Sequence, residues 1–232
     1  MLLTLATLPG VGDRLGPLRQ GMAATGLAEA FATADTDTVY GWLMDLLSLQ
    51  GVSDAIALGY IATHGNANRA TIRQHMATTR CACPKLAGFE AHLGCRYRKG
   101  AATCARPQHL RLCPVRKLPL RKGLLNVQAY SLHFFLRDLC GDDLAGFIDR
   151  QIAAAKAEGP EADGGDSGDG GGADVDGAVG GQESGAGLDW VDSARARLVA
   201  SLSRIDGVSS KLANMILADI LLGGWPDDPD WE

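Results

Sequence analysis

The stretch "LSRIDGVSSKLANMILAD", from Leu202 to Asp219, decides the fold. Apolar residues at helical spacing lie on both sides of a Gly-Val-Ser turn at 207–209, and Lys211 follows this turn. The pattern predicts two helices joined by a tight turn, with the second helix beginning at 209 or 210.

Such a turn is suited to an anion. The first backbone N–H groups of the second helix lack partners within the helix and lie at the positive end of its dipole. Gly207 permits a positive φ and a close approach of the backbone, and Lys211 adds a formal charge. A nucleic-acid phosphate fits there and would position the protein without reading sequence. The alternative is an ordinary corner between packed helices, where the glycine only turns the chain.

Helical spacing recurs through the rest of the chain, with little of the alternation typical of strands. Further helices are predicted over 38–50, 53–65, 124–140, 142–156 and 189–205, with a break at Gly141. The sequence therefore predicts an all-α protein.

Charge is segregated along the chain. The formal net charge is −5, but residues 158–189 hold nine acidic side chains and no Lys or Arg, so that elsewhere 22 basic side chains face 18 acidic ones. Between Arg69 and Lys122, 13 basic side chains accompany one acid, Glu90. This block indicates a polyanionic partner. The Gly/Asp-rich stretch 158–188 has too few large apolar groups to fold and is expected to be a disordered acidic linker.

The chain has no run of about 18 apolar residues, so no transmembrane helix is expected. The first residues lack the basic start and small-residue cleavage pattern of a signal peptide. We therefore expect a cytoplasmic monomer with no membrane partner, associated with the nucleoid if the source is bacterial.

The turn and its flanks resemble the helix-hairpin-helix motif of base-excision DNA glycosylases similar to endonuclease III. The matching positions are Ile205, Gly207, Val208, Lys211, Ala213, Asn214, Ile216 and Leu217. Ser209 replaces the second glycine of the motif, and Asp206 replaces its usual proline. A second, similar hairpin lies in "LPGVGDRLG", 8–16, with Arg14 in the position of the lysine; its alternative is a plain Pro-Gly turn.

The resemblance implies roles for individual residues. Lys211 would be the amine that attacks the sugar C1′ and displaces a damaged or modified base, after which the Schiff base breaks the strand by β-elimination. Gln50, in "LLSLQGVSD", would fill the gap left by the extruded base, or is simply a polar residue at a helix end. "GGWP", 223–226, resembles the segment that precedes the family's catalytic aspartate. Asp228 or Asp230 would supply that carboxylate, although no following helix holds either.

Six cysteines are present, and five lie in a basic segment between predicted helices. Cys83, Cys95, Cys104 and Cys113 are separated by 11, 8 and 8 residues. Clustered thiols in a loop-rich segment indicate metal ligands, with the metal supplying the folding energy of the segment. Cys81 is an alternate ligand, and His92 or His109 could replace a cysteine. Cys140, on an apolar helix face, is expected in the core.

Many glycosylases of this type carry a four-iron cluster, and the Cys-Pro pairs at 83–84 and 113–114 resemble those that often flank iron–sulfur ligands. Both points favour a 4Fe-4S centre, with zinc as the alternative. The family's tight cysteine spacing is absent, however, and the cysteines lie elsewhere in the chain. The metal segment would also present basic side chains to DNA. The expected double-stranded DNA contacts are Gly207, Val208, Ser209, Ser210, Lys211, Gln50, Arg96, Arg98 and Lys99.

Together these observations predict a helix-hairpin-helix glycosylase-like bundle with an inserted cysteine-rich metal-binding loop. Its parts are an N-terminal helical part (1–80), the cysteine-rich segment (81–122), two helices (123–157), the linker (158–188) and the hairpin segment (189–232). The expected function is DNA binding and base-excision repair as a glycosylase with lyase activity. The alternatives are a non-catalytic DNA-binding module of the same fold and a metal-stapled RNA-binding protein.

Overall fold

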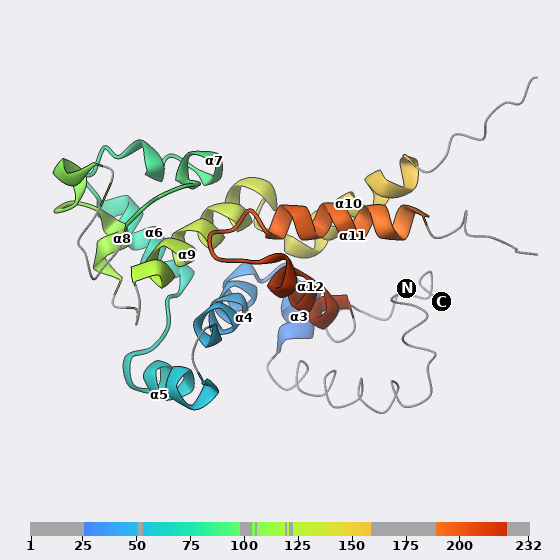
Figure 1. Ribbon diagram of the computed structural model, residues 1–232, viewed down its shortest axis with the longest axis horizontal. Coiled ribbons are helices and arrows are strands. Elements are labelled where there is room, and N and C mark those ends of the chain that lie inside the picture. The colour runs from blue at the N-terminus through green and yellow to red at the C-terminus, as the bar shows by residue number, and fades with distance from the viewer. Residues whose placement is uncertain are drawn as a thin grey trace, which may run out of the picture.

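A computed structural model of the chain describes residues 26–50, 53–97, 104, 106–118, 120, 123–158 and 189–221. Within these residues the chain is helical and contains no strand, which confirms the all-α prediction (Figure 1). The first helices are α3 (Leu27–Ala32), α4 (Thr36–Leu49), α5 (Asp54–His64) and α6 (Arg69–Thr78). The cysteine-rich segment holds only short elements, namely η1 (Pro84–Leu86), α7 (Phe89–His92), η2 (Pro107–His109) and α8 (Pro114–Lys117). The remaining elements are α9 (Gly123–Phe134), a π-helical turn η3 (Phe135–Leu139), α10 (Leu144–Ala157), α11 (Asp189–Leu202) and α12 (Ser210–Asp219).

Side-chain caps determine where several helices begin. The carboxylate of Asp35 accepts the N–H groups of Asp37 and Thr38 at the start of α4. Asn68 caps α6, and Asp143 caps α10 through the N–H of Gly146 at 2.8 Å. Because these short polar side chains satisfy N–H groups that have no partner within the helix, the chain switches to helix at these points.

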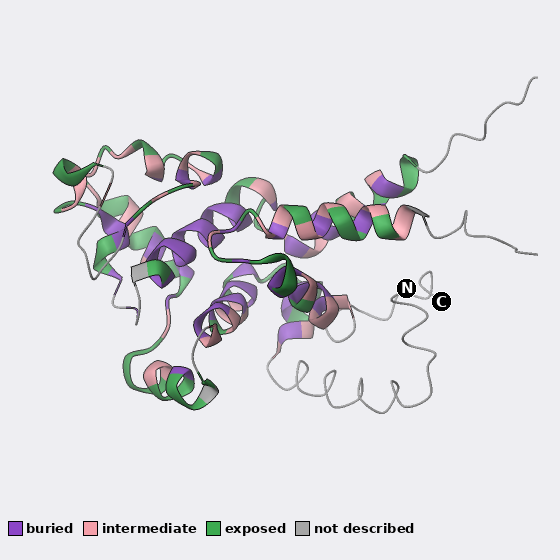
Figure 2. Ribbon diagram, in the orientation of Figure 1, coloured by how far each residue is buried: buried purple, intermediate pink, exposed green. Residues whose placement is uncertain are grey.

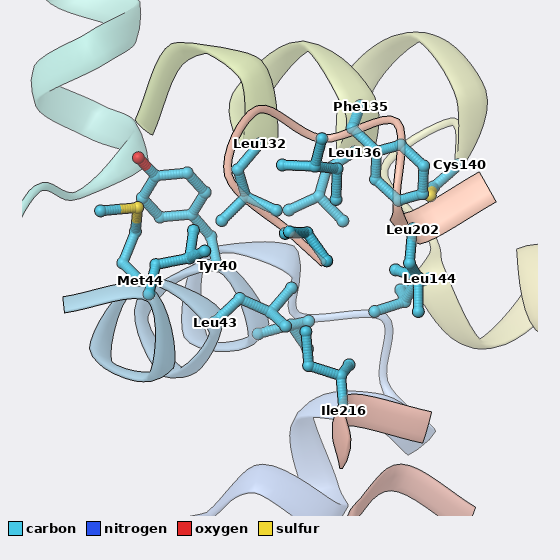
Figure 3. Packing of buried hydrophobic residues seen from close by; sticks show 14 of the residues in the cluster. Tyr40, Leu43, Met44, Leu132, Phe135, Leu136, Cys140, Leu144, Leu202 and Ile216 are labelled. Carbon is cyan, nitrogen blue, oxygen red and sulfur yellow. The ribbon is translucent and has the colours of Figure 1, made fainter. Parts of the chain in front are cut away.

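The helix α9 is the centre of the core. Every residue from 125 to 136 is buried, which Figure 2 shows as a continuous purple ribbon. Leu132 and Leu136 face Leu43 of α4 and lie above Ile216 of α12 (Figure 3). A helix buried on all sides must satisfy its polar groups internally. Accordingly, the side-chain amide of Asn126 donates to the carbonyl oxygens of residues 115 and 118. The hydroxyl of residue 40 donates to the carbonyl oxygen of residue 129.

An ion-pair cluster ties the start of α4 to α6 and to the turn after η3. Arg69, only 3% exposed, pairs with Asp37 at 3.2 Å and with Asp142. Arg73 also pairs with Asp37. Gly141, with φ 66°, makes the turn that brings Asp142 to this cluster, and the predicted helix break at this glycine is confirmed.

The other predicted helices are present with small shifts in their bounds, as α4, α5, α10 and α11. The region 124–140 differs, because α9 passes into the π-helical turn η3 instead of continuing as an α-helix. The helix α6 was not predicted. No helix in the described part of the chain is long and apolar enough to cross a membrane. Most of the linker, 159–188, lies outside the described residues.

Candidate nucleic-acid interface and cysteine-rich segment

The hairpin consists of α11, a turn at 203–209 and α12. Ile205 and Val208 are buried in the turn, and Ser209 caps α12 by accepting the N–H of Leu212 at 3.3 Å. The helix therefore begins at Ser210, as predicted. Ser209 has φ −76° and ψ 161°, an extended conformation that any residue adopts. The position therefore has no need of the glycine that the family carries, and a serine gains a cap there.

The two amides after the cap point away from intrachain partners. Within the described residues, the N–H groups of Ser210 and Lys211 have no hydrogen-bond acceptor, whereas that of Ala213 donates to the carbonyl of Ser209 at 2.8 Å. Ser209, Ser210 and Lys211 are all exposed. Free amides on an exposed first turn, with a lysine beside them, form an anion-binding arrangement.

Gly207 has φ 81°, the left-handed conformation that the sequence predicted. A Cβ at this glycine would lie 1.7 Å from Nε2 of Gln128, a buried side chain of α9. The glycine is thus required on the protein side of the turn, where α9 packs against it. This contact agrees with the alternative in which the glycine serves the packing of the turn, and its close approach to DNA stays a prediction.

The turn is also held by Ser131 of α9, whose Oγ accepts the backbone N–H of Asp206 at 3.0 Å. Burial raises the pKa of the Asp206 carboxyl, while the charges of His92 and Lys85 act in the opposite direction. Asp206 therefore turns toward the cysteine-rich segment. Within α12, Asn214 donates to the carbonyl of Ser210 at 2.7 Å and so closes the first turn.

Lys211 is exposed. An attacking amine must be neutral, and partial burial is one way to favour that form. The described residues do not bury this side chain. The two candidate carboxylates, Asp228 and Asp230, lie outside the described residues, as do Arg98, Lys99 and the hairpin at 8–16.

Gln50 is the C-cap of α4. Its side-chain Nε2 is buried and has no hydrogen-bond partner within the described residues. A buried amide without a partner is costly and favours another conformation of this side chain, and the role of Gln50 as a wedge stays a prediction. A hollow of about 10 Å³ lies nearby, lined by residues of α4, α5 and the start of α9. It has room for roughly one water and is too small for a nucleobase.

The basic block divides into two groups. Arg69 and Arg73 serve the ion-pair cluster with Asp37, and Lys85 donates to the carbonyl of Leu93 at 2.6 Å, so these three side chains belong to the fold. Arg69 is buried with two acidic partners that lie 32 and 73 residues away in the sequence, so it is not available to a polyanion, and the expected contact elsewhere in the block stays a prediction. The exposed basic side chains described in the block are Arg73, Arg80, Arg96, Arg106, Arg111, Arg116 and Lys117, and all of them except Arg73 lie outside the ion-pair cluster.

Backbone groups interact with the thiols of the cysteine-rich segment. The N–H of Arg106 donates to Sγ of Cys104 at 3.4 Å. The backbone of Tyr97 lowers the pKa of the Cys95 thiol, and the backbone at residues 115 and 116 lowers that of Cys113. Such interactions favour the thiolate and are typical of sulfur ligands around metals.

Burial disfavours the charged thiolate form of these cysteines. Burial, with smaller contributions from Cys81 and Cys95, raises the pKa of the Cys113 thiol to about 11. Burial likewise raises the pKa of Cys95, with smaller contributions from Cys104 and Cys83. The five thiols thus influence one another electrostatically, and all six cysteines of the chain are free. No three donors among the described residues are close enough to form a ready metal-binding group.

The histidines of the segment differ. His92 is fully buried, with Nδ1 at 2.9 Å from the carbonyl oxygen of Lys85 and Nε2 at 3.2 Å from that of Val127. It is therefore part of the core and not a candidate ligand, contrary to one predicted alternative. His109 lies at the thiols, with Nδ1 3.7 Å from Sγ of Cys81. Cys140 is 1% exposed and belongs to the core, as predicted (Figure 3).

Comparisons of the chain with protein-family models, curated proteins and solved structures return no match.

Proposed function

We propose that this protein binds double-stranded DNA through the hairpin, with the N–H groups of Ser210 and Lys211 and the Lys211 ammonium on one phosphate. The observation that carries the proposal is the exposed first turn of α12, whose two amides have no acceptor among the described residues. The exposed basic side chains of the cysteine-rich segment support a polyanionic partner.

A proline substitution at one position tests whether the hairpin amides contact DNA. Ser210 is the first residue of α12, where proline is tolerated because its φ suits the helix and the missing N–H has no partner within the helix. The preceding residue, Ser209, is already extended, as a residue before proline must be. Ser210→Pro therefore removes one donor and leaves the hairpin folded.

Fluorescence anisotropy with a 20-base-pair duplex, at several salt concentrations, measures the result. We expect Ser210→Pro to weaken binding roughly tenfold, since a hydrogen bond to a charged group contributes about 1.5 kcal/mol. Ser210→Ala, which keeps the N–H, should bind like the wild type. Equal affinities of the proline and alanine variants would contradict the amide contact. Preference of the wild type for a structured RNA of equal length would favour RNA as the partner.

Base excision is a second candidate, favoured by the place of Lys211 in the first turn of α12. In this proposal Nζ forms a bond to the sugar C1′ as the bond to the damaged base breaks. The resulting Schiff base permits β-elimination of the 3′ phosphate. Asp228 or Asp230 would stabilise positive charge on the sugar. Base extrusion would require Gln50 to leave its buried position and the region around it to open.

Borohydride trapping tests this candidate. Incubation with duplexes that carry single damaged bases or abasic sites should give a covalent adduct for the wild type. Lys211→Ala should abolish the adduct and weaken duplex binding about threefold, as expected for the loss of one phosphate contact. Binding without any adduct or base release would leave a non-catalytic DNA-binding module.

The metal centre proposed for the cysteine-rich segment would be held by Cys83, Cys95, Cys104 and Cys113, with Cys81 as the alternate. The donor chemistry fits, because Sγ of Cys104 accepts the N–H of Arg106, and nearby backbone groups lower the pKa of the Cys95 and Cys113 thiols. A bound metal would supply folding energy to a segment whose helices have four residues or fewer. Four thiolates suit a 4Fe-4S cluster as well as zinc. Metal analysis after anaerobic purification, with an absorption band near about 400 nm for a cluster, separates the two.

A further inference from the structure

The helix α7 connects the cysteine-rich segment to the hairpin. It lies between Cys83 and Cys95 in the chain, and its Glu90 forms an ion pair with Arg204 at the start of the hairpin turn. The guanidinium of Arg204 also lies 5.3 Å from the centre of the Phe89 ring. One side chain of the turn is therefore held by two neighbouring residues of α7.

The helix α7 is itself firmly placed. The backbone N–H of Phe89 donates to Oδ2 of Asp138 in η3 at 2.7 Å, and the Phe89 ring packs edge-on against Phe135 at 5.5 Å. His92, at the other end of α7, is fully buried against α9. A four-residue helix anchored at both ends transmits its position to whatever it contacts.

The turn also rests on α9. Ser131 accepts the N–H of Asp206, and Gln128 lies under Gly207. The turn thus contacts both α7 and α9, and its last residue, Ser209, leads directly into Ser210 and Lys211 of α12. The position of the turn determines where these amides point.

We propose that α7 is a positioning element for DNA binding, in which the Glu90–Arg204 pair and the Phe89 ring hold the hairpin amides in place for a phosphate. Through α7, the folded state of the cysteine-rich segment then governs the affinity for DNA. This inference rests on the proposed DNA-binding function of the hairpin.

The direction in which Glu90→Gln changes the affinity for DNA distinguishes a positioning role from a simple effect of charge. Glu90 is an acid, and removing an acid near a DNA site strengthens attraction to a polyanion. Positioning requires the opposite, because Glu90→Gln releases Arg204 and loosens the turn. The chain offers a matched control in the Arg197–Glu158 pair, whose side chains are 35% and 60% exposed against 42% and 69% for Arg204 and Glu90.

Duplex affinity is measured for Glu90→Gln, Arg204→Gln, the exchanged pair Glu90→Arg with Arg204→Glu, and the controls Glu158→Gln and Arg197→Gln. We expect Glu90→Gln and Arg204→Gln each to weaken binding about fivefold, and the exchanged pair to return to within about twofold of the wild type. The controls should stay within about twofold. Because both pairs are largely exposed, the variants should remain folded.

Hydrogen exchange of the bonded turn amides, those of Asp206 and Val208, without DNA gives a second readout. It should be about fivefold faster in Glu90→Gln and near the wild-type rate in the exchanged pair. Wild-type affinity or tighter binding of Glu90→Gln would overturn the positioning role, as would an exchanged pair that binds no better than Arg204→Glu alone. If the wild type binds no duplex while exchange still responds to Glu90→Gln, the proposed function fails and α7 retains only its structural contact.

Discussion

The hairpin and the cysteine-rich segment both pack against α9, but they are held in different ways. The hairpin has two helices of ten residues or more, a serine cap and buried apolar side chains at Ile205, Val208 and Leu212. The cysteine-rich segment has helices of four residues or fewer and thiols that interact with nearby backbone groups. The first region has regular helices and a local cap besides its contacts with α9 and α7, whereas the second has few interactions within itself besides its packing on α9.

The largest expected effect comes from the thiols. Cys113→Ser should lower the metal content from about one centre per chain to below about a fifth, because a structural site seldom survives the loss of a ligand. Metal analysis of the purified protein measures the change. Cys140→Ser is the matched control, since Cys140 is buried in the core away from the segment, and it should leave the metal content unchanged. Equal metal content in both variants, or none in the wild type, would contradict the proposed centre.

The hairpin is tested by its glycine. Gly207→Ala combines a positive φ with a clash against Gln128, and should lower the free energy of unfolding by about 3–4 kcal/mol. Gly141→Ala has a similar φ of 66° but no atom within 4 Å of the added Cβ, so it should cost only about 1–2 kcal/mol. Urea unfolding of the two variants measures the difference. Equal losses would mean that Gln128 moves aside and that α9 does not confine the turn.

The helix α9, which both regions share, is tested by pH. Burial, aided by the nearby charges of Arg69 and Arg137, lowers the pKa of His133 to about 4. Between pH 6.5 and 4 the unfolded chain therefore binds a proton that the folded chain does not, and stability falls as the pH is lowered. The full effect is on the order of 3 kcal/mol. Burial lowers the pKa of His92 as well, which acts in the same direction.

A substitution isolates the contribution of His133. His133→Leu replaces the imidazole with an apolar side chain of similar size in a site that is 3% exposed. Between pH 7 and pH 4.5 the variant should lose less free energy of unfolding than the wild type. The difference between the two losses is the contribution of His133. A variant that loses as much stability as the wild type over this range would show that His133 is protonated in the folded state.

Much of the hairpin could be predicted from the sequence, because its determinants are local. The turn glycine, the start of α12 at Ser210 and the break at Gly141 each follow from residues within one turn of the position concerned. Gln128 could not be predicted as the residue under Gly207, since 79 residues separate the two and only the packing of α9 joins them. The same holds for α7, whose contacts with the turn are all long-range.

For the cysteine-rich segment, the metal chemistry stays a prediction, and the geometry could not be predicted. Residue types and spacing indicated metal ligands, but the contact between Cys81 and His109 and the burial of His92 depend on how the segment folds on α9. Counting charge also misled at Arg69, because a count does not distinguish a buried arginine with two acidic partners from an exposed one.

The smallest expected effect is a change in the salt dependence of DNA binding. It distinguishes a buried arginine from an exposed one. Arg69→Gln removes a charge that is 3% exposed and leaves Asp142 unpaired, so it should lower the free energy of unfolding by about 2 kcal/mol. Asp37 keeps Arg73, which limits the loss. Because Arg69 does not reach the surface, the slope of log affinity against log salt for duplex DNA should not change.

Arg111→Gln should do the reverse. Arg111 is exposed in the cysteine-rich segment, so its loss should leave stability within about 0.5 kcal/mol of the wild type. If it contacts a phosphate, the salt slope should fall by about 1 and the affinity by about twofold. An unchanged slope for Arg111→Gln together with a reduced slope for Arg69→Gln would place the DNA on the ion-pair side of the molecule. The cysteine-rich segment would then be a support for the hairpin that does not itself touch DNA.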